Sequence, residues 1–131
     1  MTIKSSYETS TNVPGELTLR VSGVGAGAAD CTSVKGATTI DQTATGLYTV
    51  TLPRAYAVLV NVTGMVMSST VANWTVQLRS STVATDGKFL IAVLSAADNA
   101  ATAPTAKDLT TAETLMLNVV LQDTAAKPAA R

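Results

Sequence analysis

The sequence of 131 residues contains no histidine and one cysteine, Cys31, and both shortages exclude chemistry. Without histidine the chain lacks the commonest general base and the commonest ligand of transition metals. An ordinary Ser-His-Asp triad is therefore excluded, although serines are plentiful. A single cysteine excludes an internal disulfide, and we interpret Cys31 as a small buried or half-buried residue rather than as a reactive thiol.

Charge is also scarce, since charged residues make up 14% of the chain and hydrophobic residues 47%. Soluble domains normally carry about a quarter charged residues, so a surface of Thr, Ser and Ala suits a subunit that packs against neighbours. The 9 basic and 9 acidic residues balance, and no basic cluster occurs in the sequence. Nucleic-acid binding requires basic residues that contact phosphates, so we expect no nucleic-acid partner.

Long hydrophobic runs are missing as well. No run approaches the roughly 20 residues that a membrane-spanning helix needs, and Asn61 interrupts the best one. Residues 1–6 are polar and lack the apolar core of a signal peptide. We therefore expect no membrane partner, and a protein that is made in the cytoplasm without an export signal.

What the chain does contain is alternation of apolar and polar residues with a period of two, which is typical of β-strands. In residues 46–53, Tyr48 and Val50 fall on one side of an extended chain. A second alternating run covers residues 56–62. We expect these two runs to pair as a central antiparallel hairpin, joined by residues 53–55.

The same pattern predicts further strands over residues 16–21, 37–42, 73–79, 88–95 and 115–122. Asp86-Gly87 is a strong hairpin signal, and Gly64 suggests a bulge within an extension of the run 56–62. Residues 96–113 are too many for a hairpin loop and are expected to cross the sheet or wrap a neighbour. No helical period stands out, so we predict an all-β fold: an antiparallel β-sandwich or jelly roll of about seven or eight short strands with extended terminal arms.

One side of each predicted strand is apolar and is expected to face the core. The residues that we expect to be buried are Tyr48, Val50, Val58, Val60, Trp74, Val76, Phe89, Ile91, Leu117 and Val119. If Trp74 were instead exposed beside Tyr56 or Tyr7, the chain would gain an aromatic surface suited to binding sugars.

A chain of this length fits one domain, and we divide it into three parts. Residues 1–15 form an N-terminal arm, residues 16–122 a single β-sandwich domain, and residues 123–131 a C-terminal tail. The two ends are polar and rich in small residues, so they offer little area to bury on their own. We expect the N-terminal arm to become ordered only in an assembled particle, where it adds a strand to a neighbour's sheet.

Two local patterns suggest chemistry, and we interpret both as structural. Residues 23–28 match the G-x-G-x-x-A fingerprint of dinucleotide-binding proteins, but poor helix formers follow, so a flexible loop is the better interpretation. The acidic residues stand mostly at turns and strand ends, and the sequence alone brings no two of them together for a glycosidase. The Asn-x-Thr triplets at 61–63 and 73–75 fall in predicted strands and are chance matches. We therefore expect no enzyme, no catalytic or metal-binding residue and no cofactor.

Three pieces of the chain occur in a familiar order. A Gly/Ala-rich segment is followed by Thr-Gly-Leu-Tyr-Thr-Val-Thr-Leu-Pro at 45–53, by a valine-rich strand at 58–62, and by Leu-Asn-Val-Val-Leu-Gln-Asp at 117–123. Over about residues 36–123 the chain resembles small virion proteins of tailed bacteriophages, the capsid cement or decoration proteins.

Proteins of this kind are typically β-sandwich or jelly-roll modules on the outer capsid surface. The resemblance implies a structural virion protein that is assembled in the host cytoplasm, forms a dimer or trimer, and bridges and stabilises subunits of the major capsid protein on the head exterior. It supplies no catalytic residues. Two alternatives stay open: a tail or fibre-associated β-module, and an Ig-like domain that binds carbohydrate or another cell-surface ligand.

Overall fold

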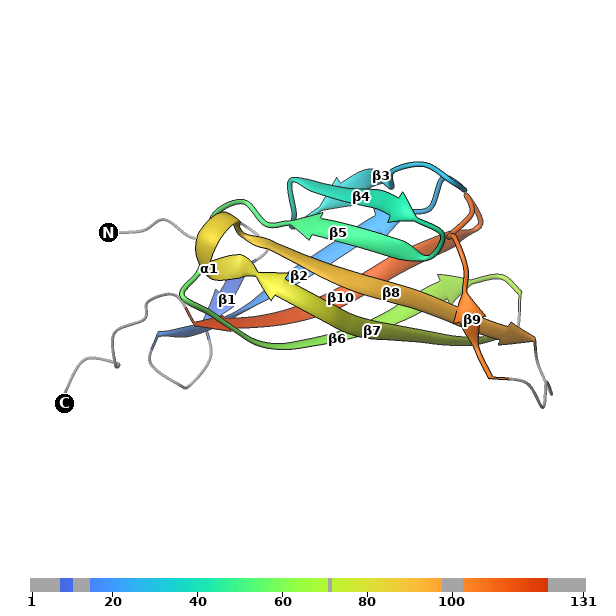
Figure 1. Ribbon diagram of the computed structural model, residues 1–131. Coiled ribbons are helices and arrows are strands. Elements are labelled where there is room, and N and C mark those ends of the chain that lie inside the picture. Colours follow the sequence, from blue (N-terminus) through green and yellow to red (C-terminus); the bar gives the residue numbers. More distant parts are fainter. Residues whose placement is uncertain (1–7, 11–14, 71, 98–102, 123–131) are drawn as a thin grey trace.

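The computed structural model describes residues 8–10, 15–70, 72–97 and 103–122, which form two antiparallel sheets packed face to face (Figure 1). Sheet A has the spatial order β1 (Glu8–Ser10), β2 (Glu16–Val24), β10 (Glu113–Gln122) and β6 (Val58–Ser68), and β3 (Thr32–Lys35) also pairs with β2. Sheet B has the order β4 (Thr39–Ala44), β5 (Leu47–Thr51), β8 (Lys88–Ala97) and β7 (Ala72–Thr82), and β9 (Thr105–Ala106) also pairs with β8. The all-β sandwich predicted from the alternation is confirmed.

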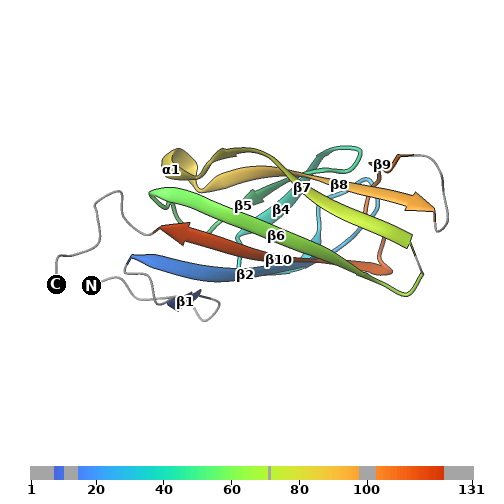
Figure 2. The same ribbon diagram turned by 90° about the horizontal axis from the view of Figure 1, so that it is seen from below.

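The chain passes between the two layers several times (Figure 2). It changes sheet between β3 and β4, between β5 and β6, between β6 and β7, and between β9 and β10. The long strand β2 and the last strand β10 are direct neighbours in sheet A. Such winding, which brings the two ends of the domain together, is typical of jelly rolls.

One hydrophobic core fills the space between the sheets. Six of the ten residues that we expected to be buried are buried: Tyr48, Val50, Phe89, Ile91, Leu117 and Val119. Trp74 and Val76 are half-buried and pack against this core. Each fully buried aliphatic or aromatic side chain contributes about 1.5–3 kcal/mol relative to an exposed position, so these six positions account for much of the fold's stability.

The expected burial of Val58 and Val60 is wrong, because their side chains are 41% and 49% exposed. Leu59 and Asn61 lie opposite consecutive residues of β10, so Val60 is an extra residue without a partner, a β-bulge. The bulge shifts the alternation, and Leu59 rather than its two neighbours packs on the core. We had expected a bulge at Gly64 instead. Gly64 lies in register opposite Leu117, and a larger residue there would collide with the Leu117 side chain.

The predicted hairpin between residues 46–53 and 56–62 is also wrong, because β5 and β6 belong to different sheets. The connection between them is attached to the turn that contains the short helix α1 (Val83–Asp86). The Leu52 N–H donates to the Gly87 carbonyl at 2.8 Å, and the Tyr56 N–H donates to the Val83 carbonyl at 3.2 Å. These bonds guide the chain around the end of the sandwich and into sheet A.

The segments outside the central strands differ from expectation in two places. Glu8–Ser10 pairs with β2, so the expectation that the arm 1–15 orders only on a partner is wrong for these three residues. The rest of that arm and the tail 123–131 lie outside the described residues. Thr32–Lys35, expected within a loop, forms β3. The crossing predicted for residues 96–113 is confirmed, since the chain passes from β9 in sheet B to β10 in sheet A.

Candidate functional site

The described part of the chain offers no arrangement of metal ligands. No group of three or more Cys, Asp or Glu side chains there could hold a metal ion. Within these residues no helix is both long enough and apolar enough to cross a membrane. Several polar side chains converge around residues 107–112, between β9 and β10, which we call the crossing segment. The partners of these side chains identify their role.

Tyr48 and Asp108 hold the crossing segment against sheet B. The buried Tyr48 hydroxyl oxygen accepts a hydrogen bond from the Leu109 N–H at 2.8 Å. The Asp108 carboxylate accepts from the Gly46 N–H at 2.8 Å and from the Gln42 side-chain amide at 3.1 Å. Burial raises the pKa of the Tyr48 phenol to about 12, so it stays protonated at neutral pH. Each polar group binds a backbone or amide partner, which indicates a structural role.

Glu113 closes the other end of the same segment. Its carboxylate accepts hydrogen bonds from the Thr110 N–H and the Thr110 hydroxyl, both at 2.8 Å, and from the Ser68 hydroxyl at 3.4 Å. Burial acts to raise the pKa of Glu113, but these hydrogen bonds outweigh burial and lower the pKa below its ordinary value. The carboxylate is therefore charged and fully engaged, rather than available as a general acid or base.

The Gly-rich segment is fastened to the crossing segment and is not a nucleotide-binding turn. The Gly25 N–H donates to the Glu113 carbonyl at 3.0 Å, and the Gly27 N–H donates to the Leu109 carbonyl at 2.7 Å. A Cβ atom on Gly25 would collide with backbone atoms of the crossing segment. Strand β3 follows where a dinucleotide site would need a helix. Close backbone contact explains Gly25, and a positive φ of 72° explains Gly27. The segment is a loop between β2 and β3, as expected, and these two hydrogen bonds fasten it.

Cys31 is buried, as expected. Burial, with a smaller effect of the charge on neighbouring Asp30, raises the pKa of its thiol to about 11. Thiolate is the nucleophilic form of cysteine, so this side chain is inert at neutral pH.

The described aromatic side chains do not form a platform for sugars. Tyr48, Tyr56 and Phe89 are buried. Trp74 is half-buried, and the Lys107 ammonium lies 5.4 Å from the centre of its ring. Tyr7, the other partner that would have supported sugar binding, lies outside the described residues. Trp74 and Tyr56 therefore do not form the exposed aromatic pair that would have favoured a carbohydrate-binding domain.

The candidate functional site is the outer face of sheet A. Strand β6 contains no charged residue, and the one acidic residue of β10, Glu113, is buried. Large apolar side chains of β6 and β10 are exposed instead: Val58 41%, Val60 49%, Met65 63%, Met67 60% and Met116 42%. Exposed apolar patches on a soluble domain mark interaction sites.

A depression of about 670 Å³ lies in this face, and we call it the sheet A groove. The pairing of the strands sets its layout. Met116 of β10 lies between Ser22 of β2 and Met65 of β6, and Lys35 of β3 lies on the far side of Ser22. In the next row, Asn118 of β10 lies between Arg20 of β2 and Thr63 of β6. The groove therefore has a basic side, an uncharged floor and an apolar side.

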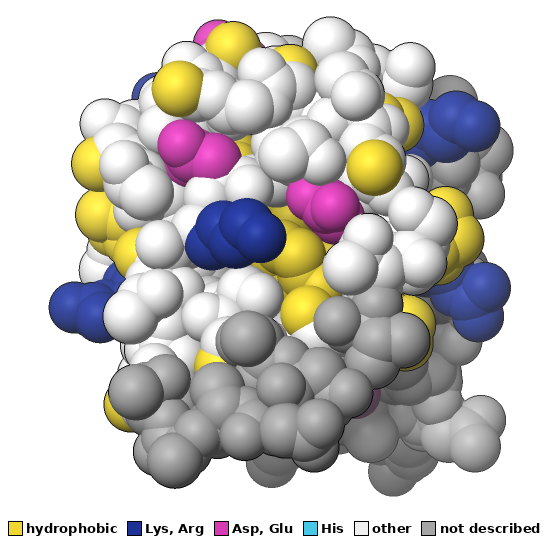
Figure 3. All heavy atoms as spheres, turned by 90° about the vertical axis from the view of Figure 1, so that its right-hand side faces the viewer, with side chains coloured by type: hydrophobic (Ala, Val, Ile, Leu, Met, Phe, Trp, Pro, Cys, Tyr) yellow, Lys and Arg dark blue, Asp and Glu magenta, His cyan; other side chains and the backbone are white. Residues whose placement is uncertain are grey.

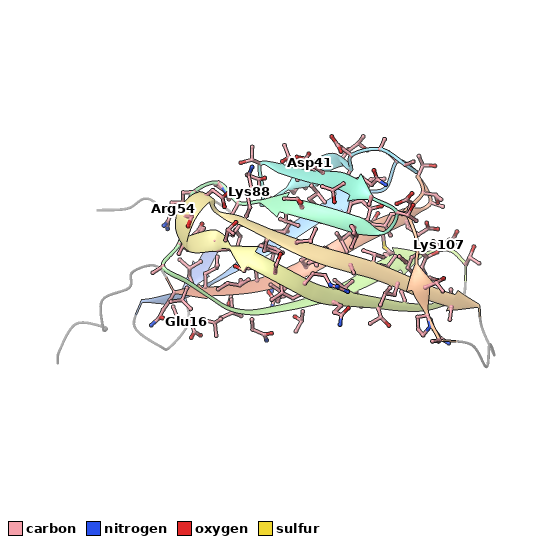
Figure 4. All side chains as sticks on the ribbon, viewed as in Figure 1. Glu16, Asp41, Arg54, Lys88 and Lys107 are labelled. Atoms are coloured by element: carbon pink, nitrogen blue, oxygen red, sulfur yellow. The ribbon has the colours of Figure 1, made fainter. Side chains whose placement is uncertain are left out.

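Charge elsewhere on the surface is sparse and scattered. Arg54 and Lys88 lie near α1 at one end of the sandwich, and Lys107 lies at the opposite end (Figure 4). The end that carries β9 shows mostly uncharged and hydrophobic surface with isolated charged side chains (Figure 3). The sequence-based interpretation of a surface poor in charge agrees with this view, but it did not identify the sheet A groove or any residue that lines it.

Comparisons with protein-family models, with curated proteins and with solved structures found no match for this chain. The protein is thus an all-β sandwich with an uncharged, methionine-containing face on sheet A. Its described polar clusters satisfy backbone groups and stabilise the crossing segment. An arrangement of this kind can bind a protein surface.

Proposed function

We propose that this protein is a structural binding module, a cement or decoration subunit that attaches to the exterior of a bacteriophage head and bridges subunits of the major capsid protein. The observation that carries the proposal is the outer face of β6 and β10, where Met65, Met67 and Met116 are exposed on strands with no exposed charge. Exposed apolar side chains gathered on one sheet face favour binding to another protein.

The physical logic is the pressure of packaged DNA on the shell. A subunit that bridges neighbours adds contact area at many symmetric positions, and several weak contacts on one particle raise the effective affinity. A sheet face suits this task, because a side-by-side array of strands presents one continuous contact surface. Self-association into a dimer or trimer would multiply these contacts further and belongs to the same proposal.

The test is binding of the purified protein to heads that were assembled without this chain. We expect the protein to sediment with such heads, to appear at regular positions in electron micrographs, and to raise the temperature at which the heads release DNA. Retention on purified tails instead of heads would support the tail-associated alternative. Absence of binding to both particles would refute the virion proposal altogether.

A matched pair of variants connects binding to the proposed face. Met67→Gln replaces an exposed apolar side chain on β6, and Thr75→Gln introduces the same amide side chain at an exposed, polar position on β7 in sheet B. We expect weaker retention on heads for Met67→Gln and unchanged retention for Thr75→Gln. Equal retention of the two variants would show that sheet A is not the attachment face.

A further inference from the structure

The basic side of the sheet A groove is formed by two residues that are 15 positions apart in the sequence. Arg20 lies on β2 and Lys35 ends β3, and the pairing of Ser22 with Lys35 places the two cations beside each other on one face. Both side chains are exposed. Within the described part of the chain neither forms an ion pair. Two adjacent cations without a counter-charge among the described side chains favour an acidic ligand.

The opposite side of the groove has different chemistry. Met65 and Met116 line it, and no charged residue of β6 or β10 faces it. Methionine is flexible and polarisable, so a pair of exposed methionines accommodates varied apolar side chains. A single occupant that satisfies both sides must therefore carry a negative charge and an apolar group.

We infer that the sheet A groove binds an extended, acidic segment of the partner protein, with a carboxylate beside Arg20 and Lys35 and an apolar side chain over Met65 and Met116. This inference rests on the proposed function and names the chemistry of the partner at that site. The volume of about 670 Å³ lies within the range of about 300–1,000 Å³ found for binding pockets.

The geometry of the sheet sets the spacing of the two groups. Neighbouring strands lie about 4.8 Å apart, and Arg20 on β2 and Met65 on β6 are offset by two strands and by two residues along the strands, so their backbones are separated by about 12 Å. An extended chain rises about 3.3 Å per residue, and its successive side chains point to opposite faces. The carboxylate and the apolar side chain of the partner must share one face and therefore lie about four residues apart.

Two other occupants fit the groove less well. A small amphiphile would need walls that bury most of its surface, whereas this depression lies on the open face of a sheet and covers one side of a ligand. A second copy docked with its groove against this one would bring no carboxylate to Arg20 and Lys35, because no acidic residue of the described part of the chain lines the groove. An acidic partner segment is therefore favoured.

The experiment compares charge-reversal variants in the head-binding assay. Arg20→Glu and Lys35→Glu each change the net charge by the same amount as the control Lys88→Glu, which lies on β8 in sheet B near α1 (Figure 4). Exposed ion pairs contribute up to about 1 kcal/mol and reversal adds repulsion, so we expect each groove variant to bind heads about tenfold more weakly. The control should bind like the wild type. Unfolding temperatures of all variants confirm that each is folded.

The salt dependence of binding tests the basic side of the groove, and NMR methyl signals test its apolar side. Binding of the wild type should weaken as salt rises, and Arg20→Glu should lose most of this dependence. A synthetic peptide containing Glu-Thr-Thr-Thr-Leu should shift the NMR methyl signals of Met65 and Met116 and leave those of Met67 unchanged.

The outcomes distinguish this inference from the proposed function. Wild-type binding to heads together with unchanged binding of Arg20→Glu and Lys35→Glu would refute the acidic occupant and leave the proposed function standing. No wild-type binding to heads would refute the proposed function, and the peptide experiment then decides on the groove alone. A change of oligomeric state in the two groove variants without heads would assign the groove to a second copy and overturn the inference.

Discussion

The two sides of the sandwich expose sheet edges that differ in length and in charge. On one side the edge strands are β1, β3, β4 and β9, with three, four, six and two residues, and they include Lys35 and Asp41. On the other side the edges are β6 and β7, with 11 residues each, and Arg79 is their only charged residue. Natural sheets protect their edges with short strands and charged side chains. The first side follows this rule and the second departs from it.

The protected side is also capped by hydrogen bonds. On β4 the Gln42 N–H donates to the Asp30 carboxylate at 2.9 Å, and the Ile40 carbonyl accepts from the Cys31 N–H at 3.0 Å. In the described residues no comparable backbone bond joins the outward edges of β6 and β7 to another segment. Each of these two strands carries a bulge, which is a weaker form of protection. The difference indicates that the β6 side remains available for a partner, and it adjoins the face that we propose for attachment.

The largest effect on stability is expected at Leu117, in the core next to β6. A Cβ atom on Gly64 would lie 2.7 Å from the Leu117 side chain, so the glycine of β6 makes room for this leucine. Leu117→Ala should lower the free energy of unfolding by about 2–5 kcal/mol, measured by urea denaturation, because it leaves a cavity. Met116→Ala is the matched control on the outer face of the same strand and should change stability by less than about 0.5 kcal/mol. Similar losses for both variants would show that β10 does not separate a core face from an outer face.

A smaller, pH-dependent effect is expected at Glu113, which belongs to the fastened crossing segment. Its pKa is lowered in the folded protein, so its stabilising contribution is present above the pKa of the unfolded chain and disappears as the pH falls through the folded-state pKa. Hydrogen bonds to a charged group contribute about 1.5–3 kcal/mol. Glu113→Gln should therefore destabilise the protein by about that amount at pH 7, and the difference from wild type should shrink under acid conditions.

Hydrogen exchange sharpens this test, because β6 and β7 contain no carboxylate. Acidification should lower the protection factor of the Thr110 amide, which donates to Glu113, more than that of the Val62 amide on β6. If Glu113→Gln and the wild type kept a constant stability difference from pH 7 to acid, the charge of Glu113 would not be the source of its contribution.

The sequence predicted strands well where only one side of the strand is apolar. In β10 the leucines and valines at every second position from 115 to 121 face the core, as expected, because the polar residues Thr114, Asn118 and Gln122 mark the other side as outward. In β6 both sides carry apolar residues, so the pattern does not fix which side is inward. One extra residue reverses the alternation, and the bulge at Val60 therefore reversed our assignment of Val58.

The sheet A groove was beyond prediction for a related reason. Its two cations, Arg20 and Lys35, become neighbours only through the pairing of β2 with β3, and β3 lies in a stretch of Ser, Thr and Gly that carries no strong strand signal. The two methionines become neighbours only through the pairing of β6 with β10. Partners far apart in sequence are fixed by sheet topology, which the alternation does not encode. The one available signal was the complete lack of charge in residues 58–68.

The smallest effect on stability, and the most direct test of the two edges, comes from adding one lysine to each side. Met67 on β6 is 60% exposed, and Thr32 on β3 is exposed as well, so Met67→Lys and Thr32→Lys should each change the free energy of unfolding by less than about 0.5 kcal/mol. An edge lysine prevents one sheet from pairing with another. Light scattering of concentrated protein should therefore decrease for Met67→Lys and stay at the wild-type level for Thr32→Lys, whose edge is already short and charged. Because both variants gain one positive charge, an equal decrease would assign the effect to net charge and would remove the distinction between the two edges.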